Sequence, residues 1–211
     1  MTRILVFGDS TAYGAWDAEG GWADRLKRYC HERTIQGKMY CLVYTLGVSG
    51  KSTDDMLMRF EAEARERMKE MEESIFIIAA GTNDSKFVHS KGCREVPPER
   101  FRKNLKRLIS LAKKRSEKVI FIGPTPVDQS KTDTVPWNKD RSFRNADIRE
   151  YSGIMEAVCK EQRVHFIGML DALRGPNLLF KDGLHPSTEG HAKMFRIVRD
   201  FLLGKGILEA G

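Results

Sequence analysis

Five short apolar runs, separated by stretches with helical spacing, constrain the fold of this chain more than any other feature of its sequence. The runs are rich in Ile, Val and Phe, and they occupy residues 3–8, 41–46, 74–81, 118–124 and 164–170. Strands that are apolar throughout are typical of a parallel sheet whose two faces are both covered by helices. The runs therefore predict five buried strands of one such sheet.

The segments between these runs carry apolar residues at the spacing of amphipathic helices. Trp22, Leu26 and Cys30 repeat every four residues. Ser52 and Asp55 resemble a capping box and predict a helix that begins near residue 53. Further helices are expected over residues 100–118, 148–158 and 188–203. We predict an α/β fold, a doubly wound three-layer sandwich with a central, mostly five-stranded parallel sheet, and a single domain over residues 1–211.

The net charge of +7 raises the question of an anionic partner such as nucleic acid. Much of the excess lies between Arg100 and Lys118, on the outward face of a predicted helix whose apolar stripe includes Phe101 and Leu105. A solvated helix face accounts for this charge. Because no nucleic-acid-binding motif accompanies it, we expect no nucleic-acid partner.

The chain shows no signal peptide at its start and no run of about 20 apolar residues that could span a membrane. Its cysteines form no C-x-x-C pair and have no histidine spacing suited to zinc. We therefore expect a cytoplasmic protein with no membrane span, no metal ion and no disulfide. The cysteines concerned are Cys30, Cys41, Cys93 and Cys159.

The sequence Gly50-Lys51-Ser52 resembles the end of a phosphate-binding loop, which would indicate a nucleotide-binding enzyme. That loop requires a glycine five positions before Gly50, where this chain has Thr45, and Gly47 comes two positions too late. A shortened loop would also offer fewer backbone N–H groups to phosphate. The pattern disfavours nucleotide binding and leaves another role open for Gly50.

Polar residues cluster where the predicted strands end, which is the edge at which open α/β sheets bind their ligands. The first strand ends in Gly8-Asp9-Ser10, and the second leads into Gly47-Val48-Ser49-Gly50. The third ends in Gly81-Thr82-Asn83-Asp84, and Asp182 and His185 follow the fifth. Each motif alone could be an ordinary turn. Together they bring every component of acyl transfer to one edge of the sheet.

These residues fit the requirements of a serine nucleophile. Ser10 needs a base to remove its proton, and His185 can serve. The imidazole needs a carboxylate to hold its other nitrogen, which Asp182 can supply from three residues earlier. The backbone N–H groups of Ser10 and Gly50 and the side-chain amide of Asn83 can stabilise the oxyanion.

The order GDS, GVSG, GTND and DGLHP resembles the SGNH (GDSL-type) family of serine esterases and lipases, over nearly the whole chain. The resemblance implies a flavodoxin-like sheet, a Ser10-His185-Asp182 triad and an oxyanion hole formed by Ser10, Gly50 and Asn83. It also implies that no cofactor is needed. The chain departs from the family pattern at Thr11 and Thr45, neither of which is expected to act chemically.

The residues together predict a carboxylic ester hydrolase that forms an acyl-enzyme, with a small-molecule ester as its partner. Residues 84–98 and 127–145 are long, irregular connections that we expect to border the substrate. They are mostly polar, which favours short-acyl soluble esters, and we expect Asp9, Phe87 and Trp137 to contact the substrate. The alternatives are a lipid acylhydrolase or thioesterase, a noncatalytic ligand-binding module, and the nucleotide-binding enzyme considered above.

Overall fold

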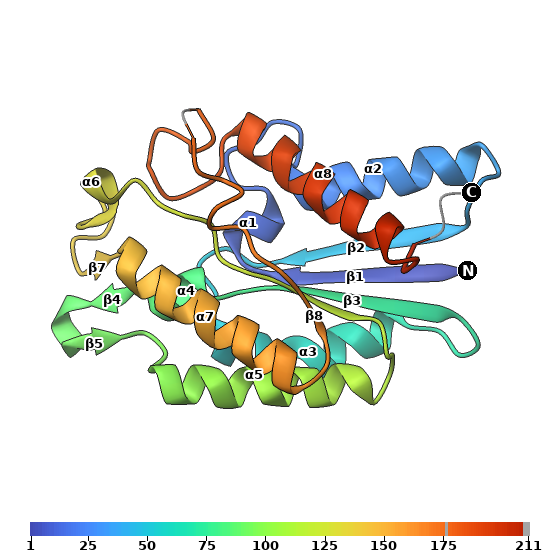
Figure 1. Cartoon of the computed structure of the whole chain (residues 1–211), viewed down its shortest axis with the longest axis horizontal. Coiled ribbons are helices and arrows are strands. Elements are labelled where there is room, and N and C mark those ends of the chain that lie inside the picture. Colours follow the sequence, from blue (N-terminus) through green and yellow to red (C-terminus); the bar gives the residue numbers. More distant parts are fainter. Residues whose placement is uncertain (176, 209–211) are drawn as a thin grey trace.

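A five-stranded parallel sheet forms the centre of the computed structural model, which describes residues 1–175 and 177–208 (Figure 1). The strand order is β2-β1-β3-β6-β8. All four strand pairs are parallel, which confirms the predicted α/β fold with a doubly wound sheet. The strands are β1 (Thr2–Gly8), β2 (Cys41–Gly47), β3 (Glu73–Ala79), β6 (Val119–Ile122) and β8 (His165–Ile167).

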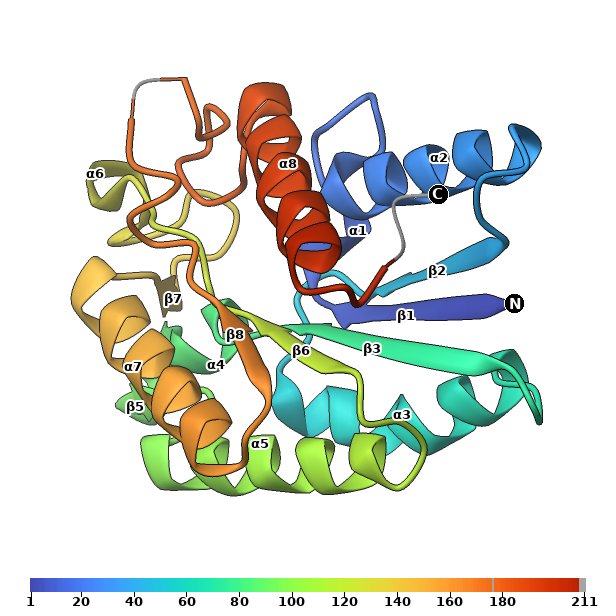
Figure 2. The same ribbon diagram turned by 45° about the vertical axis from the view of Figure 1, so that its right-hand side comes forward.

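Helices cover both faces of this sheet, as Figures 1 and 2 show. One face carries α2 (Gly21–Ile35) and α8 (Thr188–Gly204), which pack against each other. The other face carries α3 (Thr53–Arg67), α5 (Pro98–Lys113) and α7 (Asn145–Glu161). The predicted capping box is present at the start of α3, where the Asp55 carboxylate accepts the Ser52 N–H.

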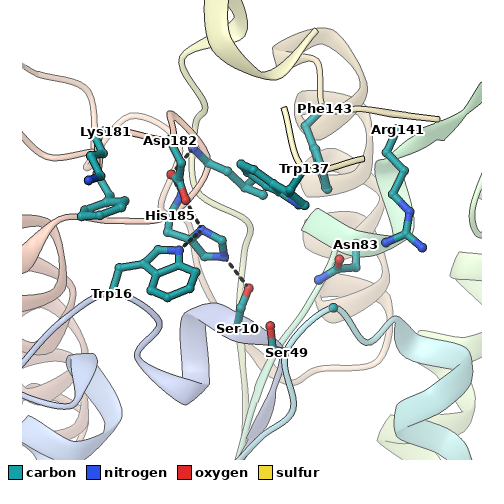
Figure 3. Close-up of a pocket in the computed structure, with 13 residues that line it drawn as sticks. Ser10, Trp16, Ser49, Asn83, Trp137, Arg141, Phe143, Lys181, Asp182 and His185 are labelled. Atoms are coloured by element: carbon teal, nitrogen blue, oxygen red, sulfur yellow. Dashed lines mark hydrogen bonds and ion pairs between the residues drawn. The ribbon is translucent and has the colours of Figure 1, made fainter. Parts of the chain in front are cut away.

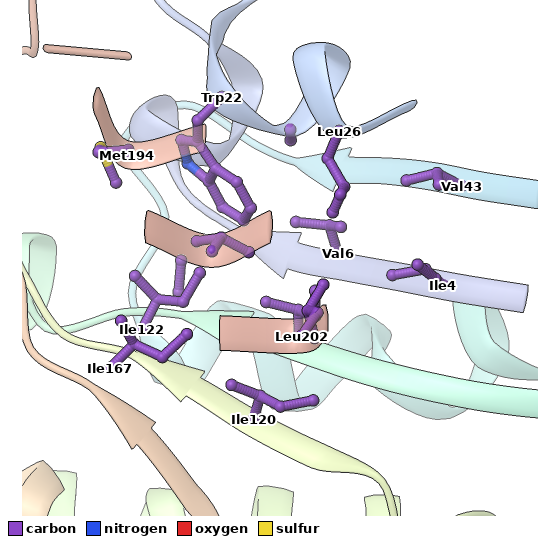
Figure 4. Close-up of a cluster of buried hydrophobic side chains, with 14 of the residues drawn as sticks. Ile4, Val6, Trp22, Leu26, Val43, Ile120, Ile122, Ile167, Met194 and Leu202 are labelled. Carbon is purple, nitrogen blue, oxygen red and sulfur yellow. The ribbon is translucent and has the colours of Figure 1, made fainter. Parts of the chain in front are cut away.

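Alternate side chains of each strand divide the core into two layers. Ile4 and Val6 of β1 face α2 and α8, where they pack with Trp22 and Leu202 (Figure 4). Their neighbours Leu5 and Phe7 face the other way and join the helices of the second face. Removing one such side chain from water stabilises the fold by about 1.5–3 kcal/mol. This two-sided burial explains why the strands read as uninterrupted apolar runs.

Three strands are shorter than the apolar runs predicted. The runs over residues 74–81, 118–124 and 164–170 form strands that end at Ala79, Ile122 and Ile167. The third run ends early because Gly81 has a φ of 109°, which turns the chain into the short helix α4 (Thr82–Ser85). The fourth ends ahead of Pro124, which has no N–H to donate to a ladder.

The two connections predicted to be irregular form short elements instead. They contribute all three strands of a second, antiparallel sheet with the order β5-β4-β7. Two-residue strands are too short to show an alternating pattern, so they could not be predicted from the sequence. The elements are β4 (Phe87–Val88), η1 (His89–Lys91), β5 (Cys93–Arg94), α6 (Gln129–Thr132) and β7 (Arg141–Ser142).

None of the helices in the described part of the chain is long and apolar enough to cross a lipid bilayer.

Candidate active site

Ser10 lies at the carboxyl edge of the sheet because the chain turns into a helix immediately after β1. It is the first residue of α1 (Ser10–Tyr13), and the Asp9 carboxylate caps this helix by accepting the Thr11 N–H at 2.9 Å. The turn needs a glycine at position 8, since a Cβ there would lie 2.4 Å from that of Ala12. The tight turn leaves Ser10 8% exposed, at the wall of a cavity.

His185 and Asp182 come from the loop ahead of α8 and face Ser10 (Figure 3). His185 Nε2 lies 2.9 Å from Ser10 Oγ, and His185 Nδ1 lies 2.7 Å from Asp182 Oδ2. The other carboxylate oxygen of Asp182 accepts the N–H groups of Leu184 and His185. Burial by itself would raise the pKa of Asp182, but the hydrogen bonds from His185 and from these amides outweigh it and lower that pKa.

Trp16 competes with Asp182 for the same imidazole nitrogen. Its indole Nε1 lies 3.1 Å from His185 Nδ1, and its ring meets the imidazole edge-on with centroids 6.0 Å apart. An indole N–H can only donate, and an ionised carboxylate can only accept, so Nδ1 cannot satisfy both. We assign the proton to Nδ1, because the contact with Asp182 is shorter and charge-assisted. This tautomer leaves Nε2 free to accept from Ser10, with Trp16 packed against the ring.

Ser10, Gly50 and Asn83, the residues expected to supply N–H donors for the oxyanion, all line the same cavity. The Gly50 amide has no protein acceptor within the described residues, and its φ of 76° suits a glycine. Asn83 donates one amide hydrogen to Asp9 Oδ2 at 3.0 Å, which leaves its second hydrogen available. Burial raises the pKa of Asp9, against the hydrogen bonds from Thr11 and Asn83. Asp9 therefore lies beneath the site as the partner that orients Asn83.

Asp84 connects the helix that carries Asn83 to the helix that follows Gly50. Its Oδ1 accepts both the N–H and the hydroxyl of Thr53, the first residue of α3, and its Oδ2 accepts the Gly81 N–H. The carboxyl group is fully enclosed, and burial together with the nearby Asp9 raises its pKa to about 6. The sequence singled out Asp84 only as part of a turn.

A cavity of ≈ 640 Å³ opens over Ser10, and most of its surface is apolar. Residues 127–145 contribute to it, as expected, and Trp137 is among them with 56% of its surface exposed. Residues 84–98 contribute none of the lining, and Phe87 lines a different hollow beside Cys93. The lining consists of Ser10, Trp16, Ser49, Gly50, Asn83, Trp137, Arg141, Phe143, Phe180, Lys181, Asp182, Leu184 and His185.

The lysine and hydroxyl of the phosphate-loop-like sequence are both engaged locally. Lys51 Nζ lies 3.0 Å from Asp55 Oδ1, and the Ser52 hydroxyl donates to Asp55 Oδ2. These contacts terminate a helix and leave neither group directed at a phosphate. Within residues 1–175 and 177–208 there is also no cluster of three or more His, Cys, Asp or Glu side chains that could hold a metal ion.

The motifs that meet at this cavity extend over almost the whole chain. Residues 6–193 match the sequence model of the GDSL-like Lipase/Acylhydrolase family. The chain belongs to this family. Among curated proteins, it is 29% identical over 141 residues to the isoamyl acetate-hydrolyzing esterase of Saccharomyces cerevisiae. That match covers 59% of this chain and 56% of the yeast protein, so the chain spans little more than half the length of this relative.

Solved structures of similar proteins share the GDSL-family fold described above. The lipase/acylhydrolase from Enterococcus faecalis superposes with a TM-score of 0.75 at 24% identity, over 97% of both chains. A variant of an acetyl xylan esterase from Geobacillus stearothermophilus superposes with a TM-score of 0.72 at 18% identity, over 99% of this chain and 96% of that one. These likenesses establish the architecture of the sheet and helices.

Sequence reasoning missed several residues that line the cavity of this GDSL-family chain. Trp16 follows the nucleophile motif by six residues, and Phe180 and Lys181 precede Asp182 directly, but none of them stands in a recognisable pattern. Arg141 lies in a segment that was expected to border the site, where its charge could have drawn attention. For the other three residues, proximity to the motif residues was the available signal.

Proposed function

We propose that this chain is a carboxylic ester hydrolase that works through a Ser10-His185-Asp182 triad and an acyl-enzyme. The observation that carries the proposal is the continuous contact from Ser10 Oγ to His185 Nε2 at 2.9 Å and from His185 Nδ1 to Asp182 at 2.7 Å. This is the geometry that a serine needs in order to lose its proton as it attacks. Membership of the GDSL-like family supports the same reading.

In the first half of the reaction, Ser10 Oγ attacks the carbonyl carbon while His185 Nε2 takes its proton. Asp182 stabilises the resulting imidazolium through Nδ1. The negative oxygen of the tetrahedral intermediate lies among the N–H groups of Ser10, Gly50 and Asn83. When the intermediate collapses, the C–O bond to the alcohol breaks and His185 returns the proton to the departing oxygen.

In the second half, water replaces the alcohol. His185 takes a proton from this water, whose oxygen attacks the acyl carbon of the ester on Ser10. The second tetrahedral intermediate uses the same three N–H donors. Its collapse breaks the bond to Ser10, which regains a proton from His185, and the carboxylic acid leaves. Beyond the water, every step uses side chains and backbone N–H groups of this chain, and none requires a cofactor.

The proposed substrate is a short-acyl soluble ester. The yeast relative is named for the hydrolysis of isoamyl acetate, an acetyl ester, which supports a small acyl group. Trp137 lines the cavity and is well exposed, so it could stack on an acetylated sugar. A second candidate is an acylhydrolase for longer chains, because the cavity of ≈ 640 Å³ has an apolar lining that includes Phe143 and Phe180.

The test of the mechanism is the Ser10→Ala variant with 4-nitrophenyl acetate as substrate. Loss of a triad nucleophile lowers turnover by about 10⁶ in serine hydrolases, so activity should disappear while the fold is kept. Ser110→Ala, on the exposed side of α5, is the matched control and should retain full activity. A serine-directed phosphonate should label Ser10 in the wild type, as detected by mass spectrometry of the peptide. Activity above a tenth of wild type in Ser10→Ala would exclude Ser10 as the nucleophile.

A chain-length series of 4-nitrophenyl esters separates the two substrate candidates. For a short-acyl esterase, kcat/KM is highest from acetate to butyrate and falls steeply by decanoate. A maximum at decanoate would favour the acylhydrolase candidate.

A further inference from the structure

Arg141 is a charged side chain of the cavity that the proposed mechanism does not use. It belongs to β7 and lines the cavity together with Ser10 and Asn83. Figure 3 shows its guanidinium extending from β7 toward the side of the cavity that holds Asn83, across from Trp16. A guanidinium in this place presents up to five N–H donors to whatever occupies the cavity.

Arg141 forms no salt bridge among residues 1–175 and 177–208, although Asp140 is close enough for the two charges to interact. Other cations nearby are held in direct ion pairs. Arg94 pairs with Asp147 at 2.6 Å, Arg144 pairs with Asp133 at 2.8 Å, and Lys86 lies 3.5 Å from Glu95. The carboxylate adjacent in sequence, that of Asp140, accepts the N–H and hydroxyl of Ser90. Arg94, Arg144 and Lys86 are thus held by direct ion pairs, and the arginine that lines the cavity is not.

The backbone fixes Arg141 in its position. Its N–H donates to Asn138 and its carbonyl accepts from Val135, both at 3.1 Å. β7 also pairs with β4, where Arg141 is opposite Val88. The strand therefore fixes where the side chain begins, and the planar guanidinium loses less freedom per hydrogen bond than a lysine ammonium would.

The charges that line the cavity add to a positive surplus. Lys181 also faces it without an ion-pair partner in the described residues, with its ammonium 5.6 Å from the centre of the Phe180 ring. The one carboxylate of the lining, Asp182, is already engaged by His185. The cavity lining therefore has two cationic side chains, Arg141 and Lys181, and one carboxylate, which pairs with His185 instead. A ligand with an anionic group would restore the balance.

We propose that Arg141 determines specificity in this cavity by binding a carboxylate or similar oxyanion on the substrate, so that the preferred esters are anionic. The inference rests on the proposed function, since it names the substrate class of the same site. The apolar lining then holds the body of the substrate, and the guanidinium pairs with its charged end. The charge can belong to the acyl part or to the alcohol part of the ester.

The test uses two pairs of esters. In each pair, one ester carries a terminal carboxylate and the other carries an uncharged group at the same position. In the first pair, mono-4-nitrophenyl adipate carries the charge in its acyl part, and 4-nitrophenyl hexanoate is its neutral counterpart. In the second pair, 3-acetoxybenzoate carries the charge in its alcohol part, and 3-acetoxybenzamide is its neutral counterpart. For each pair, the ratio of kcat/KM for the anionic to the neutral ester is measured in wild type, Arg141→Met, Arg141→Lys and Lys139→Met. Lys139 is the matched control, because it is an exposed cation of the same turn outside the cavity lining.

Arg141→Met should lower this ratio by about 10- to 100-fold in at least one pair, since it removes a charge-assisted hydrogen bond. Arg141→Lys should keep part of the ratio, and Lys139→Met should change it less than about twofold because solvent screens that charge. An unchanged ratio in both pairs, with active enzyme, overturns the inference and leaves the esterase intact.

If wild type hydrolyses none of the four esters, the proposed function fails but the inference is still decided by binding. Isothermal titration with adipate and 3-hydroxybenzoate then compares wild type with Arg141→Met. Binding that is lost in the variant supports anion recognition by Arg141, and equal binding overturns it. If Arg141→Met does not fold, as judged by circular dichroism, Arg141→Gln takes its place in both measurements.

Discussion

At the scale of single residues, the site depends on side chains that orient other side chains. Asn83 can direct an N–H at the oxyanion only if its other hydrogen is held, and Asp9 holds it at 3.0 Å. His185 presents Nε2 to Ser10 only in the tautomer that Asp182 stabilises. Two carboxylates therefore orient the proposed site: Asp182 holds the base His185, and Asp9 holds the oxyanion donor Asn83.

Asn83→Ala should lower kcat by about 10²–10³ with a smaller change in KM, because the donor matters most once the carbonyl oxygen is charged. The measurement is a full kinetic comparison on 4-nitrophenyl acetate. Asn104→Ala is the control, since this buried amide binds Thr53 and Asp54 outside the cavity and should affect stability more than kcat. A variant of Asn83 that changed KM alone would assign Asn83 to ground-state binding.

At the scale of elements, the contact between the end of β2 and α1 positions the nucleophile. Gly47, the last residue of β2, lies so close to α1 that an added Cβ would be 2.2 Å from the Tyr13 nitrogen. Backbone atoms cannot move aside as a flexible side chain would. The glycine that came two positions too late for a phosphate loop is therefore required by helix packing.

Gly47→Ala should destabilise the protein by about 1–3 kcal/mol, as overpacking does, and should also lower kcat because α1 carries Ser10. Gly153→Ala is the matched control, since Gly153 lies within α7 with open space around it. Removing a glycine from a helix interior should stabilise by about 0.5–1 kcal/mol. Urea unfolding measures the stability of both variants, and esterase assays measure their kcat. Equal changes in stability and kcat for the two substitutions would contradict the packing argument.

At the scale of the whole molecule, the buried carboxyl group of Asp84 makes stability depend on pH. Its folded pKa of about 6 lies above the ordinary 3.8, so the folded state binds the proton more tightly than the unfolded chain does. The stabilisation is fully present below pH 3.8 and is lost as the pH rises through 6. The shift corresponds to about 3 kcal/mol.

The free energy of unfolding of the wild type, relative to Asp84→Asn, should therefore improve as the pH falls from 7 to 4. Asparagine does not titrate, so the variant lacks this contribution whatever its own stability. Asp171→Asn, which changes an exposed aspartate paired with Arg174, should run parallel to the wild type over the same range. Urea unfolding at several pH values measures the difference. Parallel curves for wild type and Asp84→Asn would mean that Asp84 is ionised throughout.

The sequence by itself determined where the strands and helices of the central sandwich follow one another along the chain. It also determined the capping box at Ser52 and the four motifs of the candidate site. These features are local, because periodicity, caps and short motifs are set by neighbours within a few residues. Only the tertiary structure decided that Asp84 binds Thr53, that Trp16 lies against His185, and that two-residue strands place Arg141 in the cavity. Such contacts join segments far apart in the chain, and they exist because the packed sheet and helices hold those segments side by side.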